Sequence, residues 1–129
     1  MASKGGDRIM ELKNRSQYLD KLISVQDMEV IKVVTGIRRC GKSSLLKLMM
    51  AHLREQGVME EQILSMNFES MQFADMDSKS LYQYVMERAP KGKRLYLFLD
   101  EVQKVRDWQD AVNSFRVDLD CDIYVTGSN

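Results

Sequence analysis

The chain has 129 residues, of which 44% are hydrophobic and 29% charged, and this suits one globular domain with its own core. Its 19 basic residues cancel its 19 acidic residues, so the net charge favours neither DNA nor a protein as a partner. Two cysteines and one histidine argue against a disulfide scaffold and a zinc-type metal site. With no apolar run of a membrane span's length and no signal peptide at the start, we expect a cytoplasmic protein.

The first part of the chain joins a Gly-rich start to a helical pattern. We expect residues 1–6 to be flexible and residues 7–129 to form the domain. From about Asp7 to Val25 the apolar residues recur at the spacing of one helix face, which predicts an amphipathic helix that packs on a sheet. These apolar residues are Ile9, Leu12, Leu19, Leu22 and Ile23.

Residues 36–43 read Gly-Ile-Arg-Arg-Cys-Gly-Lys-Ser, which fits the P-loop (Walker A) pattern G-x-x-x-x-G-K-[ST]. An apolar run at residues 30–34 precedes the pattern and leucines at helical spacing follow it, so we expect a strand, a glycine loop and a helix. A chance glycine loop would give the same letters, and the order of these elements counts against it.

The pattern predicts a nucleotide site because each part of it has a physical role. Gly36 and Gly41 let the backbone approach a phosphate, and the amides at the helix start favour an anion. Lys42 would reach the β- and γ-phosphates of ATP, and the Ser43 hydroxyl would bind Mg²⁺. The predicted nucleotide-binding set is Gly36, Ile37, Arg38, Arg39, Cys40, Gly41, Lys42, Ser43 and Ser44.

The middle of the chain alternates between strand and helix patterns. Residues 62–68 are expected to form a strand, and residues 78–89 a helix capped by Asp77 or Ser78. Pro90 and Gly92 then interrupt the chain.

The run from Leu95 to Leu99 is apolar and ends in Asp100 and Glu101, as a buried parallel strand with acids at its carboxyl end would. Ligands of open α/β sheets bind at that edge. Asp100 would hold Mg²⁺ opposite Ser43, as the acid of a Walker B strand does, and Glu101 would orient and deprotonate the attacking water. Taken alone, the two acids would be a solvated strand terminus, and the P-loop upstream favours the catalytic interpretation.

After this strand we expect Asp107 to cap a helix whose apolar residues Trp108, Ala111, Val112 and Phe115 face the core. The acids that follow, Asp118, Asp120 and Asp122, lack the glycine and closing glutamate of a calcium loop, so a solvated turn is expected. Residues 122–126 form the last predicted strand.

Three segments, Thr35 to Leu46, Phe98 to Gln103 and Val125 to Asn129, together resemble the AAA-type ATPase domain of prokaryotic ATP-binding proteins. In that family a C-terminal domain of unknown function often follows. The resemblance implies an α/β fold, a three-layer P-loop NTPase sandwich with a parallel sheet and helices on both faces. It places the last strand between the P-loop strand and the Walker B strand, and a fifth strand and a lid beyond residue 129, so we expect a truncated domain and a fragment of a longer ATPase.

The resemblance also implies two polar site residues. Asn129, in preference to Ser128, sits where such ATPases carry a sensor of the γ-phosphate or the attacking water. Asn67 resembles a residue that can hydrogen-bond the catalytic Glu101 and hold it inactive. Ordinary strand-end chemistry would also favour these residue types.

The expected function is ATP binding and Mg²⁺-dependent ATP hydrolysis by an ATPase module that couples nucleotide state to conformational change. A regulatory nucleotide switch without significant hydrolysis is the alternative, and a small-molecule phosphotransferase is less favoured because no acceptor site is evident. The catalytic set is Glu101, Lys42 and Asn129, and Ser43 and Asp100 are the metal ligands. The P-loop strand would be a hydrophobic sheet edge, which predicts self-association, and the isolated chain is expected to hydrolyse ATP slowly.

Overall fold

The computed structural model describes residues 15–35 and 39–127. Eight helices and strands build the described part of the chain, with short 3₁₀ helices between them. In chain order these are α2 (Arg15–Ser24), β1 (Lys32–Val34), α3 (Arg39–Glu55), η1 (Glu60–Gln62), β2 (Ile63–Asn67), η2 (Met71–Phe73), α4 (Ser78–Arg88), β3 (Leu95–Asp100), η3 (Val102–Lys104), α5 (Trp108–Asp118) and β4 (Cys121–Thr126). None of the described helices is long and apolar enough to cross a membrane.

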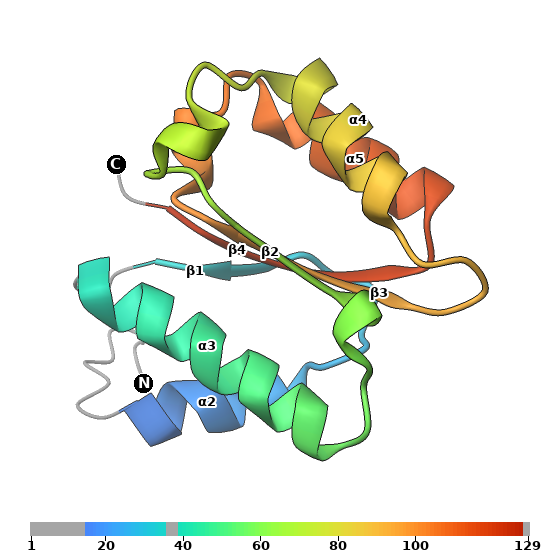
Figure 1. Cartoon of the computed structure of the whole chain (residues 1–129). Helices are drawn as coiled ribbons and strands as arrows, with labels where there is room; N and C mark the ends of the chain where they lie inside the picture. The colour runs from blue at the N-terminus through green and yellow to red at the C-terminus, as the bar shows by residue number, and fades with distance from the viewer. Residues whose placement is uncertain (1–14, 36–38, 128–129) are drawn as a thin grey trace.

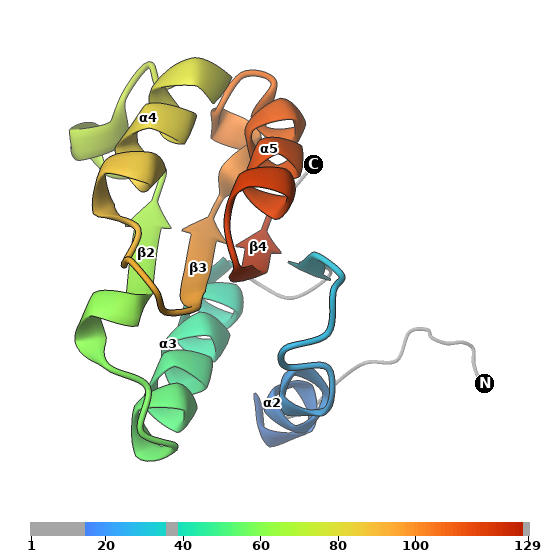
Figure 2. The ribbon, with the colours of Figure 1, turned by 90° about the vertical axis from the view of Figure 1, so that its right-hand side faces the viewer.

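The strands form one parallel sheet in the order β1-β4-β3-β2. Helices α2 and α3 cover one face and α4 and α5 cover the other (Figure 1). The chain crosses the sheet from β1 to β2 and then returns by single steps through β3 to β4 (Figure 2). Because crossovers between parallel strands are right-handed, the reversal places α3 on the face opposite α4 and α5. The predicted three-layer fold is confirmed, including the position of the last strand between β1 and β3.

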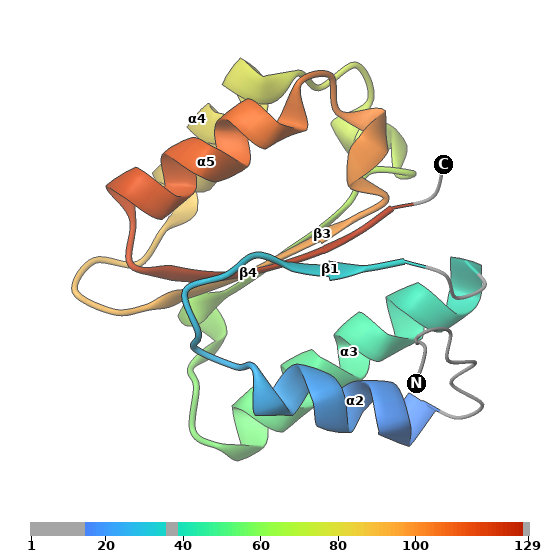
Figure 3. The same cartoon turned by 180° about the vertical axis from the view of Figure 1, so that it is seen from behind.

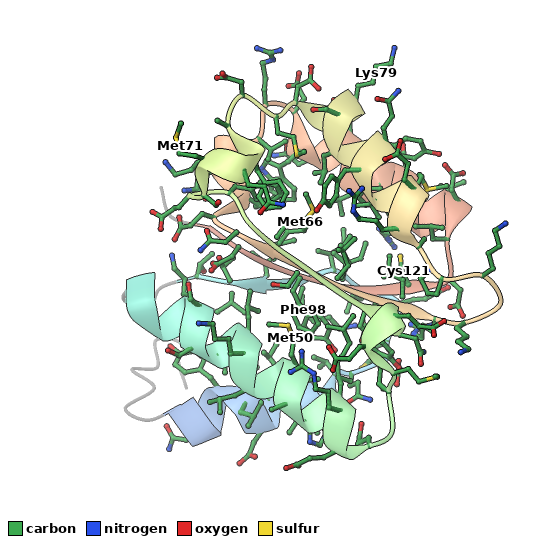
Figure 4. All side chains as sticks on the ribbon, viewed as in Figure 1. Met50, Met66, Met71, Lys79, Phe98 and Cys121 are labelled. Carbon is green, nitrogen blue, oxygen red and sulfur yellow. The ribbon has the colours of Figure 1, made fainter. Side chains whose placement is uncertain are left out.

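The sheet divides the hydrophobic core into two halves. The two central strands, β3 and β4, contribute side chains to both halves. All six residues of β3 are buried, so alternate side chains enter opposite halves. Phe98 packs with Met50 of α3 on one face, whereas Met66 lies on the face of α4 and α5 (Figure 4). The rings of Phe98 and Tyr124 stack with centroids 4.8 Å apart.

The sequence predicts N-terminal caps for two helices, and the structure shows one of them. Asp77 caps α4 through two reciprocal hydrogen bonds. Its carboxylate accepts from the Ser80 backbone N–H, and the Ser80 hydroxyl oxygen accepts from the Asp77 backbone N–H. Asp107 precedes α5 at the predicted position, but it adopts the left-handed conformation, φ 58°, and its side chain makes no cap hydrogen bond. The predicted capping role of Asp107 is therefore wrong, although the helix begins where expected.

The acid cluster after α5 is only partly the solvated turn that the sequence predicts. Asp118 and Asp120 are exposed, but Asp122 is 1% exposed and lies inside β4 rather than in a solvated turn. Its carboxylate bonds the Lys32 ammonium at 2.5 Å and accepts hydrogen bonds from the Tyr124 hydroxyl and the Asp27 backbone N–H. Burial, reinforced by this bond to Asp122, raises the pKa of Tyr124. The register of β1 against β4 thus gives the aspartate a cationic partner.

Strand β1 forms one edge of the sheet and pairs within the described chain with β4 (Figure 3). Apolar side chains are exposed beside it: Met28, Val30 and Val33 before and within the strand, and Val117 on α5. Met28, Val30 and Val117 line a groove of about 460 Å³, whose rim carries charged residues of both signs: Glu29, Arg94, Arg116 and Asp120. A rim with both charges is compatible with a second copy of the same surface.

We therefore expect the chain to self-associate through this edge, as predicted from the sequence. Val33→Lys, which places a charge on the 58% exposed position of β1, should shift the chain to monomer. Met71→Lys, at an 87% exposed position on η2, is the matched control and should leave association unchanged. Light scattering at increasing concentration measures both, and a strictly monomeric parent chain would contradict the expectation.

Candidate functional site

The carboxyl ends of the parallel strands meet at one edge of the sheet. The register aligns Val34 with Thr126 and Asn67 with Asp100 along this edge. Helix α3 begins at the same edge, so its first turn faces the ends of β3 and β4 (Figure 1). Residues far apart in sequence are brought together here.

One side-chain contact at this edge joins α3 to β3. The Ser43 hydroxyl donates a hydrogen bond of 2.5 Å to Oδ2 of Asp100, which lies 57 residues later in the chain. Asp100 is 6% exposed, and its second carboxylate oxygen accepts a hydrogen bond from the Thr126 hydroxyl. A hydroxyl oxygen and a carboxylate oxygen therefore lie side by side, which is a ligand pair suited to a hard cation.

Lys42 lies one position earlier on α3 and is 2% exposed. Its ammonium donates a hydrogen bond of 2.8 Å to the carbonyl oxygen of Gly127, just beyond β4. A carbonyl satisfies one donor but carries no formal charge, so this bond does not neutralise the buried ammonium. A bound anion would supply the negative charge that the carbonyl lacks.

Glu101 follows β3 in a turn of unusual geometry. It adopts the left-handed conformation at φ 57° and ψ 49°, which costs a non-glycine residue about 1–2 kcal/mol. The turn is held by its backbone N–H, which donates to the Thr126 hydroxyl at 2.9 Å, and by its carbonyl, which begins η3. The Glu101 side chain is buried, and its Oε1 accepts a hydrogen bond of 2.8 Å from the Gln103 amide. Strain of this kind is commonly found where a side chain must be held for function.

Thr126 is the residue that joins the two acids, and sequence reasoning gave it no role. Its fully buried hydroxyl donates to Asp100 and accepts from the Glu101 N–H. The signal in the sequence is the polar end of an otherwise apolar strand, but its use depends on β4 lying next to β3. Thr126 fixes the carboxylate of Asp100 and the backbone of Glu101 at once.

Comparison with known proteins decides the family of this chain. The model of a family described as an AAA domain matches residues 29–129. The chain belongs to the AAA domain family. An uncharacterized protein of Haemophilus influenzae (strain ATCC 51907 / DSM 11121 / KW20 / Rd) is 41% identical over 118 residues, which are 90% of this chain and 30% of that protein. The chain thus spans less than a third of that relative's length, and no solved structure matches it.

Several predicted site residues of this AAA domain fall in the described chain. Gly41, Lys42, Ser43 and Ser44 lie in the first turns of α3, and the backbone of Arg39 and Cys40 begins that helix. Gly36, Ile37, Arg38 and Asn129 lie outside the described residues, as does Ser128. The structure brings Ser43 to Asp100 and leaves the roles of all these residues as predictions.

Within the described residues, the side-chain amide that bonds Glu101 is not that of Asn67, the residue expected from the sequence. The Asn67 side-chain oxygen accepts a hydrogen bond of 3.0 Å from the Glu69 backbone N–H, which closes the turn after β2. The amide that holds the Glu101 carboxylate belongs to Gln103. Sequence reasoning missed Gln103 because its contact with Glu101 depends on the left-handed turn at Glu101 and on η3, which hydrophobic spacing does not predict.

The donor chemistry of the AAA domain fits Mg²⁺ bound together with phosphates. Within residues 15–35 and 39–127 no group of three or more His, Cys, Asp or Glu side chains could hold a metal ion. Mg²⁺ commonly takes one or two protein oxygens and completes its shell with water and phosphate oxygens. Ser43 and Asp100 offer such a pair.

Proposed function

We propose that this AAA domain binds ATP with Mg²⁺ and hydrolyses it, and that nucleotide state is coupled to conformational change. The observation that carries the proposal is the Ser43–Asp100 contact beside the buried ammonium of Lys42, which within the described residues donates to a backbone carbonyl. A P-loop needs these three groups together, because phosphates require a cation and Mg²⁺ requires oxygen ligands.

In this proposal each side chain has one role. Lys42 binds the β- and γ-phosphate oxygens, and Ser43 and Asp100 hold Mg²⁺. When bound, Mg²⁺ supplies positive charge against the phosphate oxygens in the transition state. Asp100 is positioned for this role by Thr126, whose hydroxyl occupies the carboxylate oxygen that Ser43 does not contact.

Glu101 acts as the general base in the same scheme. It accepts a proton from the attacking water while the water oxygen bonds to the γ-phosphorus. The bond between that phosphorus and the bridging oxygen breaks, so ADP and inorganic phosphate form. A base must lie within hydrogen-bond reach of its water, and the strained turn holds the Glu101 side chain at the strand end.

A nucleotide switch without significant hydrolysis is the second candidate. The Gln103–Glu101 hydrogen bond favours it, because an amide bound to the carboxylate competes with water for the same oxygen. The two candidates share the phosphate site and differ in turnover, so binding is tested first.

The first experiment is calorimetric titration of ATP and ADP with and without Mg²⁺. Lys42→Ala should weaken Mg²⁺-dependent binding by about 10- to 150-fold, since a hydrogen bond to a charged group contributes about 1.5–3 kcal/mol. Lys47→Ala removes an exposed lysine of the same helix and should leave binding unchanged. Equal binding by the Lys42 variant and its parent, or no binding by either, would overturn the proposal for this chain.

A further inference from the structure

A turn after β3 brings the side chains of Glu101 and Gln103 into contact. The left-handed conformation of Glu101 ends β3, and η3 carries Gln103 back over the strand end. The Gln103 Nε2 then donates to Glu101 Oε1 at 2.8 Å. The hydrogen bond fixes the plane of the carboxylate relative to the edge of the sheet.

The other end of the Gln103 amide lies beside Gly127, just beyond β4. A Cβ atom added to Gly127 would lie 3.1 Å from Gln103 Oε1, which is closer than a relaxed contact allows. The φ of Gly127 lies outside the left-handed range, so its backbone conformation does not require glycine. A side chain at position 127 would therefore require the Gln103 amide to shift by a few tenths of an ångström.

Gly127 also carries the carbonyl that accepts the hydrogen bond of Lys42. One residue therefore bonds the lysine proposed to bind phosphate and leaves the space beside the amide that holds the proposed base. Two hydrogen bonds, Lys42 to Gly127 and Gln103 to Glu101, therefore lie next to each other at the strand ends, with Gln103 Oε1 beside Gly127.

We propose that Gln103 is the positioning residue of Glu101 and that Gly127 is the surface against which its amide is held. This inference rests on the proposed role of Glu101 as the general base. A general base acts only within a narrow range of distance and direction, and a misplacement of about 1 Å can cost about 100-fold in rate. Gln103 thus contributes to kcat through its hydrogen bond to Glu101.

The test is single-turnover ATP hydrolysis with the protein in excess. Gln103→Ala should lower kcat by about 10- to 100-fold and leave the ATP dissociation constant within about twofold. Gln103→Glu should show the same loss, because a carboxylate cannot donate to Glu101. Gln83→Ala, at an exposed position of α4, is the matched control and should keep the parent rate.

Gly127→Ala tests whether the space beside Gly127 positions the Gln103 amide. The added methyl group must displace the Gln103 amide by a few tenths of an ångström, so a smaller loss of kcat is expected. In the double variant Gln103→Ala/Gly127→Ala the methyl has no amide to displace, and the rate should equal that of Gln103→Ala alone. Additive losses, or an unchanged rate in Gln103→Ala, would overturn the inference. A faster Gln103→Ala would overturn it too and would support the switch, in which the amide competes with water.

Two further measurements separate this inference from the proposed function. If Glu101→Gln abolishes turnover and Gln103→Ala does not change it, the positioning role is wrong and the base role stands. If turnover is too slow to compare, the side-chain amide NMR resonance of Gln103, identified by its loss in Gln103→Ala, should shift in Glu101→Ala and in Gly127→Ala. An unchanged resonance in both variants would also overturn the inference.

Discussion

Glu101→Gln is expected to slow ATP hydrolysis by about 10²- to 10⁴-fold while Mg²⁺-dependent ATP binding is retained. The amide has nearly the same shape as the carboxylate, so it can keep the turn after β3, and its oxygen can still accept the hydrogen bond from Gln103. It cannot accept a proton from water. Phosphate release under single-turnover conditions measures the rate, and calorimetry measures the binding.

The matched control for this substitution is Glu87→Gln, an exposed carboxylate on α4, which should leave the rate unchanged. Equal turnover by Glu101→Gln and its parent would remove Glu101 from the chemistry. The proposal of a switch without significant hydrolysis would then be the better description of the same phosphate site.

Lys32→Met is expected to lower the free energy of unfolding by about 3–5 kcal/mol, because it leaves a buried carboxylate without its cation. The side chains of Lys32 and Asp122 are 3% and 0% exposed. After the substitution, Asp122 would keep only neutral donors from the described chain, the Tyr124 hydroxyl and the Asp27 N–H. Urea denaturation followed by circular dichroism measures the change.

Two controls make the Lys32 prediction specific. Lys93→Met removes an exposed pair with Glu61, where the charges are 3.4 Å apart, and should cost at most about 1 kcal/mol. The double variant Lys32→Met/Asp122→Leu should recover much of the loss, since replacing both members of a buried pair by apolar groups is often close to neutral. A loss below about 1 kcal/mol in Lys32→Met would show that water reaches Asp122.

Much of the fold could be predicted because hydrophobic spacing is a local property of the chain. The apolar run of β3 and the periodic faces of α4 and α5 lie within a residue or two of their predicted bounds. The alternation of strand and helix then implies a parallel sheet with right-handed crossovers. The resemblance to AAA-type domains added the order of the strands, which spacing alone does not give.

The principal residues of the candidate site could also be proposed from the sequence, since Lys42 and Ser43 belong to one short pattern and Asp100 and Glu101 to another. Each pattern ties a chemical group to the end of a predicted element. Parallel strands bring those ends to one edge, and the Ser43–Asp100 hydrogen bond follows from that geometry.

What the sequence by itself determined is thus the type of each element and the two patterns that name a phosphate site. Tertiary structure decided the contacts between neighbouring strands: the Thr126 hydroxyl between two acids, the Gln103 amide on Glu101, and the pairing of Asp122 with Lys32. Hydrophobic spacing along the chain predicts which face of a helix or strand a residue occupies. It does not record what lies opposite, because strand order and register are set by the packing of the whole sheet.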